Sequence, residues 1–225
     1  MYRVSVSTLE KFRRYMSEAS SLDTEEALIE SIKGLFAGND KTQFGGAYHL
    51  LIEGEYENLA GRFIVEDFSF SFEQAKPAID YRNAHPFMVH EMPARKIYES
   101  SFFPIQVTGR VDGIEGMHVR DAKTKFRNFT VSEYLSSSQW KFYLDMLGMN
   151  TFFYDVFEVI GFDSIPFQPP YCFDVAIVAH PEIKCVRYPD MEKELVILIN
   201  DFLTYVISRD LLQFLKPALP ETSIF

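Results

Sequence analysis

Residues 107–125 read VTGRVDGIEGMHVRDAKTK, and the prediction of the fold starts from this stretch. Its two arms are rich in Val, Ile and Thr, and Glu115-Gly116 lies between them, so the stretch is predicted to form a β-hairpin. A turn at these two residues places Asp112 opposite Val119. The hairpin would then form two neighbouring antiparallel strands of a sheet.

Side chains alternate along a strand, so Val119, Asp121 and Lys123 share one face of the predicted hairpin, and Asp112 shares it with them. Asp112 and Asp121 become diagonal neighbours, roughly 7 to 8 Å apart at Cα, which is close enough to share a cation. Two interpretations remain open, a solvated face of alternating charges and a metal site. A slip of one residue in the pairing would move Asp112 to the opposite face.

Length and composition indicate one globular domain. The chain has 225 residues, of which 47% are hydrophobic and 16% aromatic, which suits a single domain over residues 1–225 of α/β or α+β class. The formal net charge of −10 argues against a protein that coats nucleic acid nonspecifically, because such binding depends on cations opposite the phosphates. A local basic groove remains compatible with this charge.

The absence of long apolar runs bears on location. Neither a run of about eighteen apolar residues nor an apolar signal core occurs, so we expect no membrane span, no secretion and a cytoplasmic location. Cys172 and Cys185 lack CxxC spacing and are predicted to be buried free thiols.

Hydrophobic periodicity predicts helices and strands on both sides of the hairpin. Ser7 and Glu10 match a capping box at the start of the first helix. The predicted helices cover residues 7–16 and 23–36, about 47–61, 132–147 and about 190–215, and the core covers about 45–180. The predicted strands cover residues 62–72, 87–100, 151–160, 171–180 and 183–189, and the assignment between 72 and 87 stays open.

Four short motifs follow one another along the predicted helix, hairpin and helix. They are Gly45 with His49 (GxxxH), GRVD ending at Asp112, DAK from Asp121 to Lys123, and Gln139 with Tyr143 (QxxxY). Taken singly, each is compatible with ordinary packing or a solvent-facing side chain. In this order they resemble the RecB-like, lambda-exonuclease-like branch of the PD-(D/E)XK nuclease superfamily. The resemblance covers residues 45–148 and implies a restriction-endonuclease-like core, a central mixed β-sheet flanked by helices in α-β-β-β-α-β order.

The resemblance also implies a role for each motif residue. His49, Asp112, Asp121 and the backbone carbonyl of Ala122 would ligate one or two Mg²⁺ or Mn²⁺ ions. Lys123 would orient or help deprotonate the attacking water, and a nearby cation with partial burial is expected to lower its pKa.

Further residues complete the implied site. Gln139 and Tyr143 would line its DNA side, and Glu53 and Glu91 are candidates to support the metal ligands, with a solvent-facing charge as the alternative. The two cysteines cannot supply the four-cysteine frame of some relatives, so no iron–sulfur cluster is expected.

The expected function is therefore a metal-dependent deoxyribonuclease. The family favours an exonuclease that acts on DNA ends or single strands in recombination, repair or phage DNA processing, with a recombination or helicase protein as a compatible partner and an oligomer as a compatible state. Three alternatives remain open: a structure-specific endonuclease, a non-catalytic DNA-binding or assembly subunit with the same fold, and a structural α+β protein.

Overall fold

A computed structural model describes the chain except residues 19, 36–37, 127–128, 167 and 221–225. In the described part, a central sheet of eight strands contains β1 (Tyr2–Ser5), β5 (Val89–Tyr98), β6 (Ile105–Glu115), β7 (His118–Lys125), β8 (Thr151–Ile160), β10 (Ala176–Ala179), β11 (Ile183–Val186) and β12 (Lys216–Pro217). The order is β10-β8-β7-β6-β1-β12, and β11 also pairs with β8 and β5 with β6. The pairs β1–β6 and β7–β8 are parallel and the others antiparallel, so the sheet is mixed.

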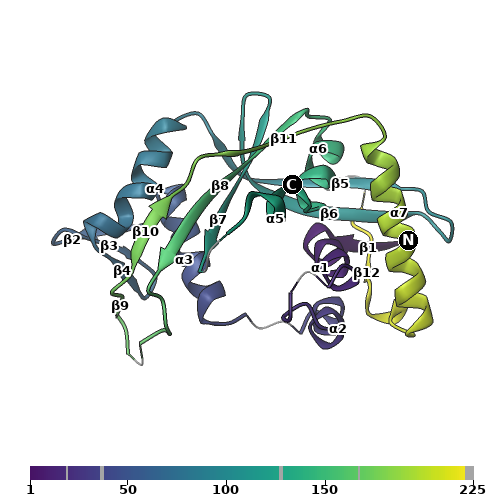
Figure 1. Cartoon of the computed structure of the whole chain (residues 1–225), viewed down its shortest axis with the longest axis horizontal. Helices are drawn as coiled ribbons and strands as arrows, with labels where there is room; N and C mark the ends of the chain where they lie inside the picture. The colour runs from purple at the N-terminus through teal and green to yellow at the C-terminus, as the bar shows by residue number, and fades with distance from the viewer. Residues whose placement is uncertain (19, 36–37, 127–128, 167, 221–225) are drawn as a thin grey trace.

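Helices and a smaller sheet surround the central sheet. The helices are α1 (Val6–Met16), α2 (Glu25–Lys33), α3 (Asp40–Glu53), α4 (Phe72–Ala84), α5 (Val131–Leu135), α6 (Gln139–Leu147) and α7 (Met191–Ser208). The smaller sheet contains β2 (Glu57–Leu59), β3 (Arg62–Val65), β4 (Phe68–Phe70) and β9 (Tyr171–Cys172). Figure 1 shows α7 at one end of the central sheet and α4 with the smaller sheet at the other. A central mixed sheet flanked by helices confirms the predicted fold class.

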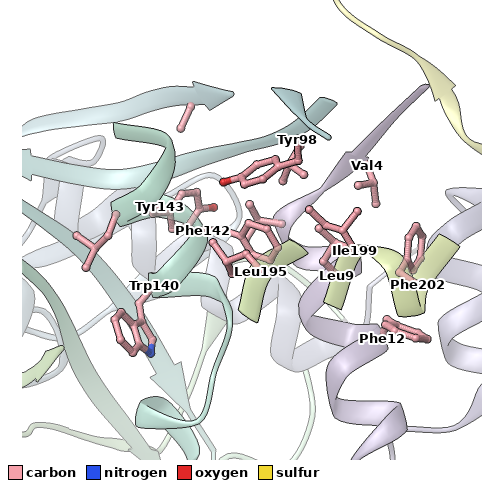
Figure 2. Packing of buried hydrophobic residues seen from close by; sticks show 14 of the residues in the cluster. Val4, Leu9, Phe12, Tyr98, Trp140, Phe142, Tyr143, Leu195, Ile199 and Phe202 are labelled. Atoms are coloured by element: carbon pink, nitrogen blue, oxygen red, sulfur yellow. The ribbon is translucent and has the colours of Figure 1, made fainter. Parts of the chain in front are cut away.

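Two hydrophobic clusters form the core on either side of the strands that carry the motifs. In the larger one, Leu9 and Phe12 of α1 lie beside Ile199 and Phe202 of α7 (Figure 2). The rings of Phe12 and Phe202 meet edge to face, with centroids 5.5 Å apart, an arrangement that aromatic pairs favour. Positions 9, 12, 199 and 202 recur at helical spacing, which is why each helix buries one side.

The second cluster holds α3 and α4 against β7, β8 and the smaller sheet. Phe44 and Tyr48 of α3 are buried in it, together with Phe70 and Phe157. The ring of Tyr48 lies 5.5 Å from that of Phe157 on β8, between centroids. This packing fixes α3, the helix with the GxxxH motif, over the hairpin.

The hairpin of β6 and β7 turns one residue later than predicted. Gly116 and Met117 form the turn, and Ile114 pairs with Val119. Gly116 has φ +59°, and a glycine at the first central position of a two-residue turn accepts this value without strain. The predicted turn at Glu115-Gly116 would have put Glu115 in that position, so it was wrong.

The shift changes the pairing by two positions, so it keeps the predicted face. Gly113 pairs with Arg120, and the next position along would bring Asp112 opposite Asp121. This register, extended by one position, would make the two carboxylates direct instead of diagonal neighbours. The predicted pairing of Asp112 with Val119 was wrong, but side-chain alternation still assigns Asp112 and Asp121 to one face.

Three helices differ from the prediction. Helix α3 begins at Asp40 and ends at Glu53, so the prediction of a helix that starts near Ala47 and continues through Gly54 was wrong. The cap of α1 is Ser5, whose Oγ accepts a hydrogen bond from the Thr8 amide, and not Ser7. Helix α4 was not predicted, although Ser71 and Gln74 form a complete capping box at its start. Pro77 lies inside α4 and its apolar periodicity is weak, so the pattern that reveals other helices is lost there.

Several predicted elements are shorter or divided. The segment 62–72 forms β3 and β4, the segment 132–147 forms α5 and α6, and the segment 171–180 forms β9 and β10. The predicted helix over residues 23–36 corresponds to α2, which ends at Lys33, and Phe36 falls outside the described residues. Helix α7 ends at Ser208, and a short 3₁₀ turn follows at Leu212–Phe214.

Both cysteines were predicted to be buried free thiols. Cys185 is buried, but Cys172 is exposed, so the prediction of a buried thiol was wrong for Cys172. Both are free thiols.

None of the helices in the described ranges combines the length and the apolar character that crossing a membrane requires.

Candidate metal and nuclease site

The strands β6 and β7 separate at the two aspartates of the hairpin. The last recorded pair before the opening is Gly113 with Arg120. Beyond it, Asp112 Oδ2 accepts a hydrogen bond of 2.9 Å from the Ala122 amide. This carboxylate thereby replaces a backbone partner in the ladder, and the opening brings Asp112 beside the backbone of residues 121–122.

Helix α3 brings His49 to this opening. The Nε2 atom of His49 lies 2.7 Å from the Ala122 carbonyl oxygen and 3.8 Å from Asp112 Oδ2. Contact with a carbonyl oxygen requires the tautomer with hydrogen on Nε2. Burial, followed by the charge of Lys123, lowers the pKa of His49, so the imidazole is neutral near pH 7.

Gly45 explains the spacing of the GxxxH motif. A Cβ at this position would lie 2.7 Å from Thr124 Oγ1 on β7, so the missing side chain permits the close approach of α3. His49 follows one helical turn later on the same side. The glycine thus sets the distance between the helix and the strand, and the histidine reaches the Ala122 carbonyl across it.

Asp121 is almost fully buried, with 1% of the residue exposed. Its Oδ1 accepts a 3.0 Å hydrogen bond from Gln139 Nε2, and its Oδ2 lies 2.6 Å from Lys123 Nζ in an ion pair but outside hydrogen-bond geometry. Burial and the charge of Asp112 raise the pKa of Asp121 to about 7. The carboxylate is therefore poised to exchange a proton or a cation near neutral pH.

Lys123 differs from its expected state. Burial favours the neutral amine, but the charges of Asp121 and Asp112 outweigh it and raise the pKa of Lys123 above the usual value. The predicted lowering of this pKa was wrong for the protein alone, because the expectation assumed a neighbouring cation and here two carboxylates neighbour the amine. Its side chain is 33% exposed, so it still reaches solvent.

Helix α6 holds the hairpin from the other side. Gln139 is its first residue and bonds Asp121, while Tyr143 Oη donates to the Arg110 carbonyl oxygen over 2.9 Å. Both side chains of the QxxxY motif are therefore engaged with the hairpin, and Tyr143 is buried. Neither contacts Lys123 by hydrogen bond.

Gly109 and Gly46 give a matched test of this packing. A Cβ on Gly109 would lie 2.6 Å from Cε1 of the buried Tyr143 ring, whereas a Cβ on Gly46 of α3 would meet nothing within 4 Å. We expect Gly109→Ala to lower the free energy of unfolding by about 1–3 kcal/mol through overpacking. We expect Gly46→Ala to raise it by about 0.5–1 kcal/mol. Urea titration measures both, and equal effects would contradict the close approach of Tyr143.

Glu91 and Glu53 lie beside the same carboxylates. Residue 91 falls between the pairs His90–Gly113 and Met92–Val111, so it stands at the level of Asp112, in the left-handed region with φ +58°. Burial, followed by the charge of Glu91, raises the pKa of Glu53 at the end of α3. Burial is the main cause that raises the pKa of Asp112. The charge of Lys123 and the hydrogen bond from the Ala122 amide lower it, and the charges of Glu91 and Glu53 raise it further.

The groups at the opening of the hairpin are of the kinds that ligate a divalent cation. The His49 imidazole lies 2.7 Å from the Ala122 carbonyl oxygen and 3.8 Å from the Asp112 carboxylate, and the nearby Asp121 Oδ2 is buried without a hydrogen bond. Oxygen-rich sets of this kind suit Mg²⁺, and an imidazole also suits Mn²⁺. Within the described ranges, no three His, Cys, Asp or Glu side chains already have metal-shell spacing. The residues fit the cation in chemistry, but Asp121 would have to turn from Lys123 toward it, and His49 would have to move its hydrogen from Nε2 to Nδ1.

Arg110 is a residue that the sequence analysis did not single out. Its guanidinium forms an ion pair with Glu91, and its side chain is 69% exposed. The arginine is part of the GRVD motif, and its position two residues before Asp112 could have drawn attention to it.

Comparison with known proteins bears on the fold. No protein-family model and no curated protein sequence matches the chain. The crystal structure of SSO0001 resembles it with a TM-score of 0.50 at 14% sequence identity, over 91% of this chain and 76% of that one. At this identity the likeness concerns the fold alone, and it extends over nearly the whole chain.

Proposed function

We propose that the protein is a metal-dependent deoxyribonuclease. The observation that carries the proposal is the meeting of three kinds of donor at the opening of the hairpin. His49 Nε2 lies 2.7 Å from the Ala122 carbonyl oxygen, and Asp112 bonds the amide of the same residue. The buried Asp121 and its ion-pair partner, the partly exposed Lys123, adjoin them. A carboxylate–carbonyl–imidazole set next to a lysine suits hydrolysis of a phosphodiester.

The chain's own residues would divide the work as follows. Asp112, Asp121, His49 and the Ala122 carbonyl would hold Mg²⁺ or Mn²⁺, which when bound supplies Lewis-acid stabilisation of charge on the phosphoryl group. Lys123 reaches solvent beside Asp121, so its amine can orient the attacking water and offset negative charge. Gln139 keeps Asp121 in place, and Tyr143 fixes the backbone of β6 just before Asp112.

A cleavage assay tests the proposal. Purified protein with Mg²⁺ or Mn²⁺ is incubated with linear duplex, linear single-stranded and circular DNA, each with an EDTA control. We expect cleavage of linear DNA that EDTA abolishes, and an exonuclease leaves the circle intact. Metal-dependent cutting of the circle would identify an endonuclease. Binding of DNA without any cleavage would favour the non-catalytic subunit and contradict the proposal.

Metal affinity should depend on pH because of Asp121. The pKa of this carboxyl is raised to about 7, so below that pH a cation must displace its proton. We expect the apparent affinity for Mn²⁺ to weaken about tenfold for each pH unit below 7 and to level off above it. Burial and the charge of Lys123 lower the pKa of His49, so competition by a proton on this imidazole is reduced.

Thermal unfolding with increasing Mn²⁺ at pH 6, 7 and 8 measures this effect. The metal-free protein at each pH is the control, and its own stability should fall as the pH rises from about 4 to 7, because the folded state then holds a proton that the unfolded state has lost. Equal Mn²⁺ affinity at pH 6 and pH 8 would exclude Asp121 as a ligand with this pKa.

A further inference from the structure

The guanidinium of Arg110 stands beside the candidate site on the same strand as Asp112. Asp112 lies two positions after Arg110, so alternation directs both side chains to one side of β6, about 7 Å apart along the strand. The pattern of exposure agrees, because Val111 between them is fully buried while Arg110 is exposed. Consecutive phosphates of one nucleic acid strand have a comparable spacing.

The backbone of Arg110 is fixed, while its side chain is largely exposed. Tyr143 Oη donates to the Arg110 carbonyl oxygen, and Arg110 pairs with Pro93 of β5 in regular register. The adjoining Gly109 lies against the Tyr143 ring. The arginine therefore extends from a rigid base, and little backbone freedom would be lost if it bound a ligand.

The present partner of Arg110 is replaceable. It is Glu91, whose side chain is 36% exposed, and the arginine side chain is 69% exposed. Ion pairs with this exposure contribute little to stability, typically about 0–1 kcal/mol. A guanidinium can exchange one carboxylate for the paired oxygens of a phosphate, which match its planar fork.

The carboxylates around the site repel a nucleic acid strand, and a neighbouring cation reduces this repulsion. Beside the effect of burial, the charges of Glu91 and Glu53 raise the pKa of Asp112, and the charge of Asp112 raises that of Asp121, so negative charge gathers where a polyanionic strand would have to approach. The chain as a whole carries a formal net charge of −10. A cation next to the carboxylates would offset this repulsion locally, without a basic surface elsewhere.

We propose that Arg110 forms a phosphate-binding subsite. Its guanidinium exchanges the ion pair with Glu91 for a contact with the phosphodiester next to the one that is hydrolysed. This inference rests on the proposed function, because it places the neighbouring nucleotide of a DNA strand on β6. It assigns to Arg110 the positioning of a polynucleotide and no part in bond cleavage.

Binding without turnover tests the subsite first. Fluorescence anisotropy of a labelled single-stranded oligonucleotide is measured with Ca²⁺ over a series of KCl concentrations, for the wild type, Arg110→Ala and Arg110→Lys. We expect Arg110→Ala to weaken binding about tenfold and to reduce the slope of log K against log[KCl] by about 0.7, the value for one phosphate contact on a single strand. Arg110→Lys should keep the slope and lose part of the affinity.

Arg209→Ala is the matched control. Arg209 follows α7 and forms an exposed ion pair with Glu25, and its side chain is 54% exposed. Its loss removes the same charge from the protein away from β6, so binding should stay as in the wild type. An equal loss in Arg209→Ala would show a general charge effect and overturn the subsite. Wild-type affinity in Arg110→Ala, or no binding of the oligonucleotide by the wild type, would overturn it too.

Kinetics separate the subsite from the nuclease proposal. On an oligonucleotide, Arg110→Ala should raise KM about tenfold with kcat unchanged, because the contact exists before and during the reaction. On thymidine 5′-(p-nitrophenyl phosphate), which lacks the neighbouring phosphate, it should behave as the wild type. A lower kcat on both substrates would contradict a positioning role. A wild type that binds DNA through Arg110 but cleaves neither substrate would refute the nuclease and leave the subsite standing.

Discussion

Asp112→Asn is expected to abolish metal-dependent DNA cleavage, with a loss of at least about 10³-fold in kcat/KM, because a cation's stabilisation of the phosphoryl charge amounts to several kcal/mol. The amide retains an oxygen that can accept the hydrogen bond from the Ala122 backbone, so the hairpin should keep its geometry. The substitution removes the negative charge that the cation requires. The same variant should also lose the increase in melting temperature that Mg²⁺ or Mn²⁺ produces in the wild type.

Asp80→Asn provides the control for this experiment. Asp80 is an exposed carboxylate on α4 that pairs with Lys76, and its side chain is 59% exposed. Its loss should leave both the metal-dependent thermal shift and cleavage intact. A metal-dependent shift of wild-type size in Asp112→Asn would show that the cation binds elsewhere, and the metal site described above would have to be abandoned.

Lys123→Met is expected to lower kcat about 10²- to 10³-fold, the usual effect of removing one group that stabilises negative charge in the transition state. Its metal-dependent thermal shift should persist at pH 8, because the ion pair with Asp121 Oδ2 no longer competes with the cation for that oxygen. Methionine preserves the length of the stem and removes the charge. Single-turnover cleavage of a labelled oligonucleotide together with a thermal titration with Mn²⁺ measures the two effects separately.

Lys193→Met is the matched control for the lysine. Lys193 is exposed at the start of α7 and pairs with Asp190, with a side chain that is 76% exposed. We expect wild-type turnover in this variant. If Lys123→Met also cleaves at the wild-type rate while Asp112→Asn does not, the metal site stands and the assigned role of the lysine falls.

The hairpin illustrates how far pattern alone reached. The repeat of β-branched residues predicted both strands, and alternation put Asp112, Asp121 and Lys123 on one face. The turn itself was misplaced by one residue, because a lone Glu-Gly pair does not say which central position the glycine occupies. The predicted face remained correct because the pairing shifted by two positions, and a shift by an even number of residues leaves each side chain on the same face of the sheet.

Helix α4 shows where pattern failed. Its start has a capping box at Ser71 and Gln74, which is a local signal that could have been used. Pro77 in its interior and its weak apolar stripe hid the rest. Its buried residues are Gln74, Ala75 and Ala78, which are too polar or too small to give a strong apolar periodicity.

The protonation states could not be predicted from residue types. The expected lowering of the Lys123 pKa assumed a cation as neighbour, whereas the fold puts Asp121 and Asp112 there and raises it. The pKa of Asp121, raised to about 7, depends on burial against Gln139 and on the distance to Asp112. Both depend on desolvation and distance, which are properties of packing.

The sequence by itself determined the alternation of the hairpin, the mixed α+β class and the presence of four motifs in one order, because these follow from local periodicity and chain order. Only the tertiary structure decided that α3 approaches β7 at Gly45 and brings His49 to the Ala122 carbonyl, and that Glu91 stands at the level of Asp112 with Arg110 as its partner. These contacts join residues far apart in the chain. They depend on how the two hydrophobic clusters pack the helices against the sheet, and no local pattern records that packing.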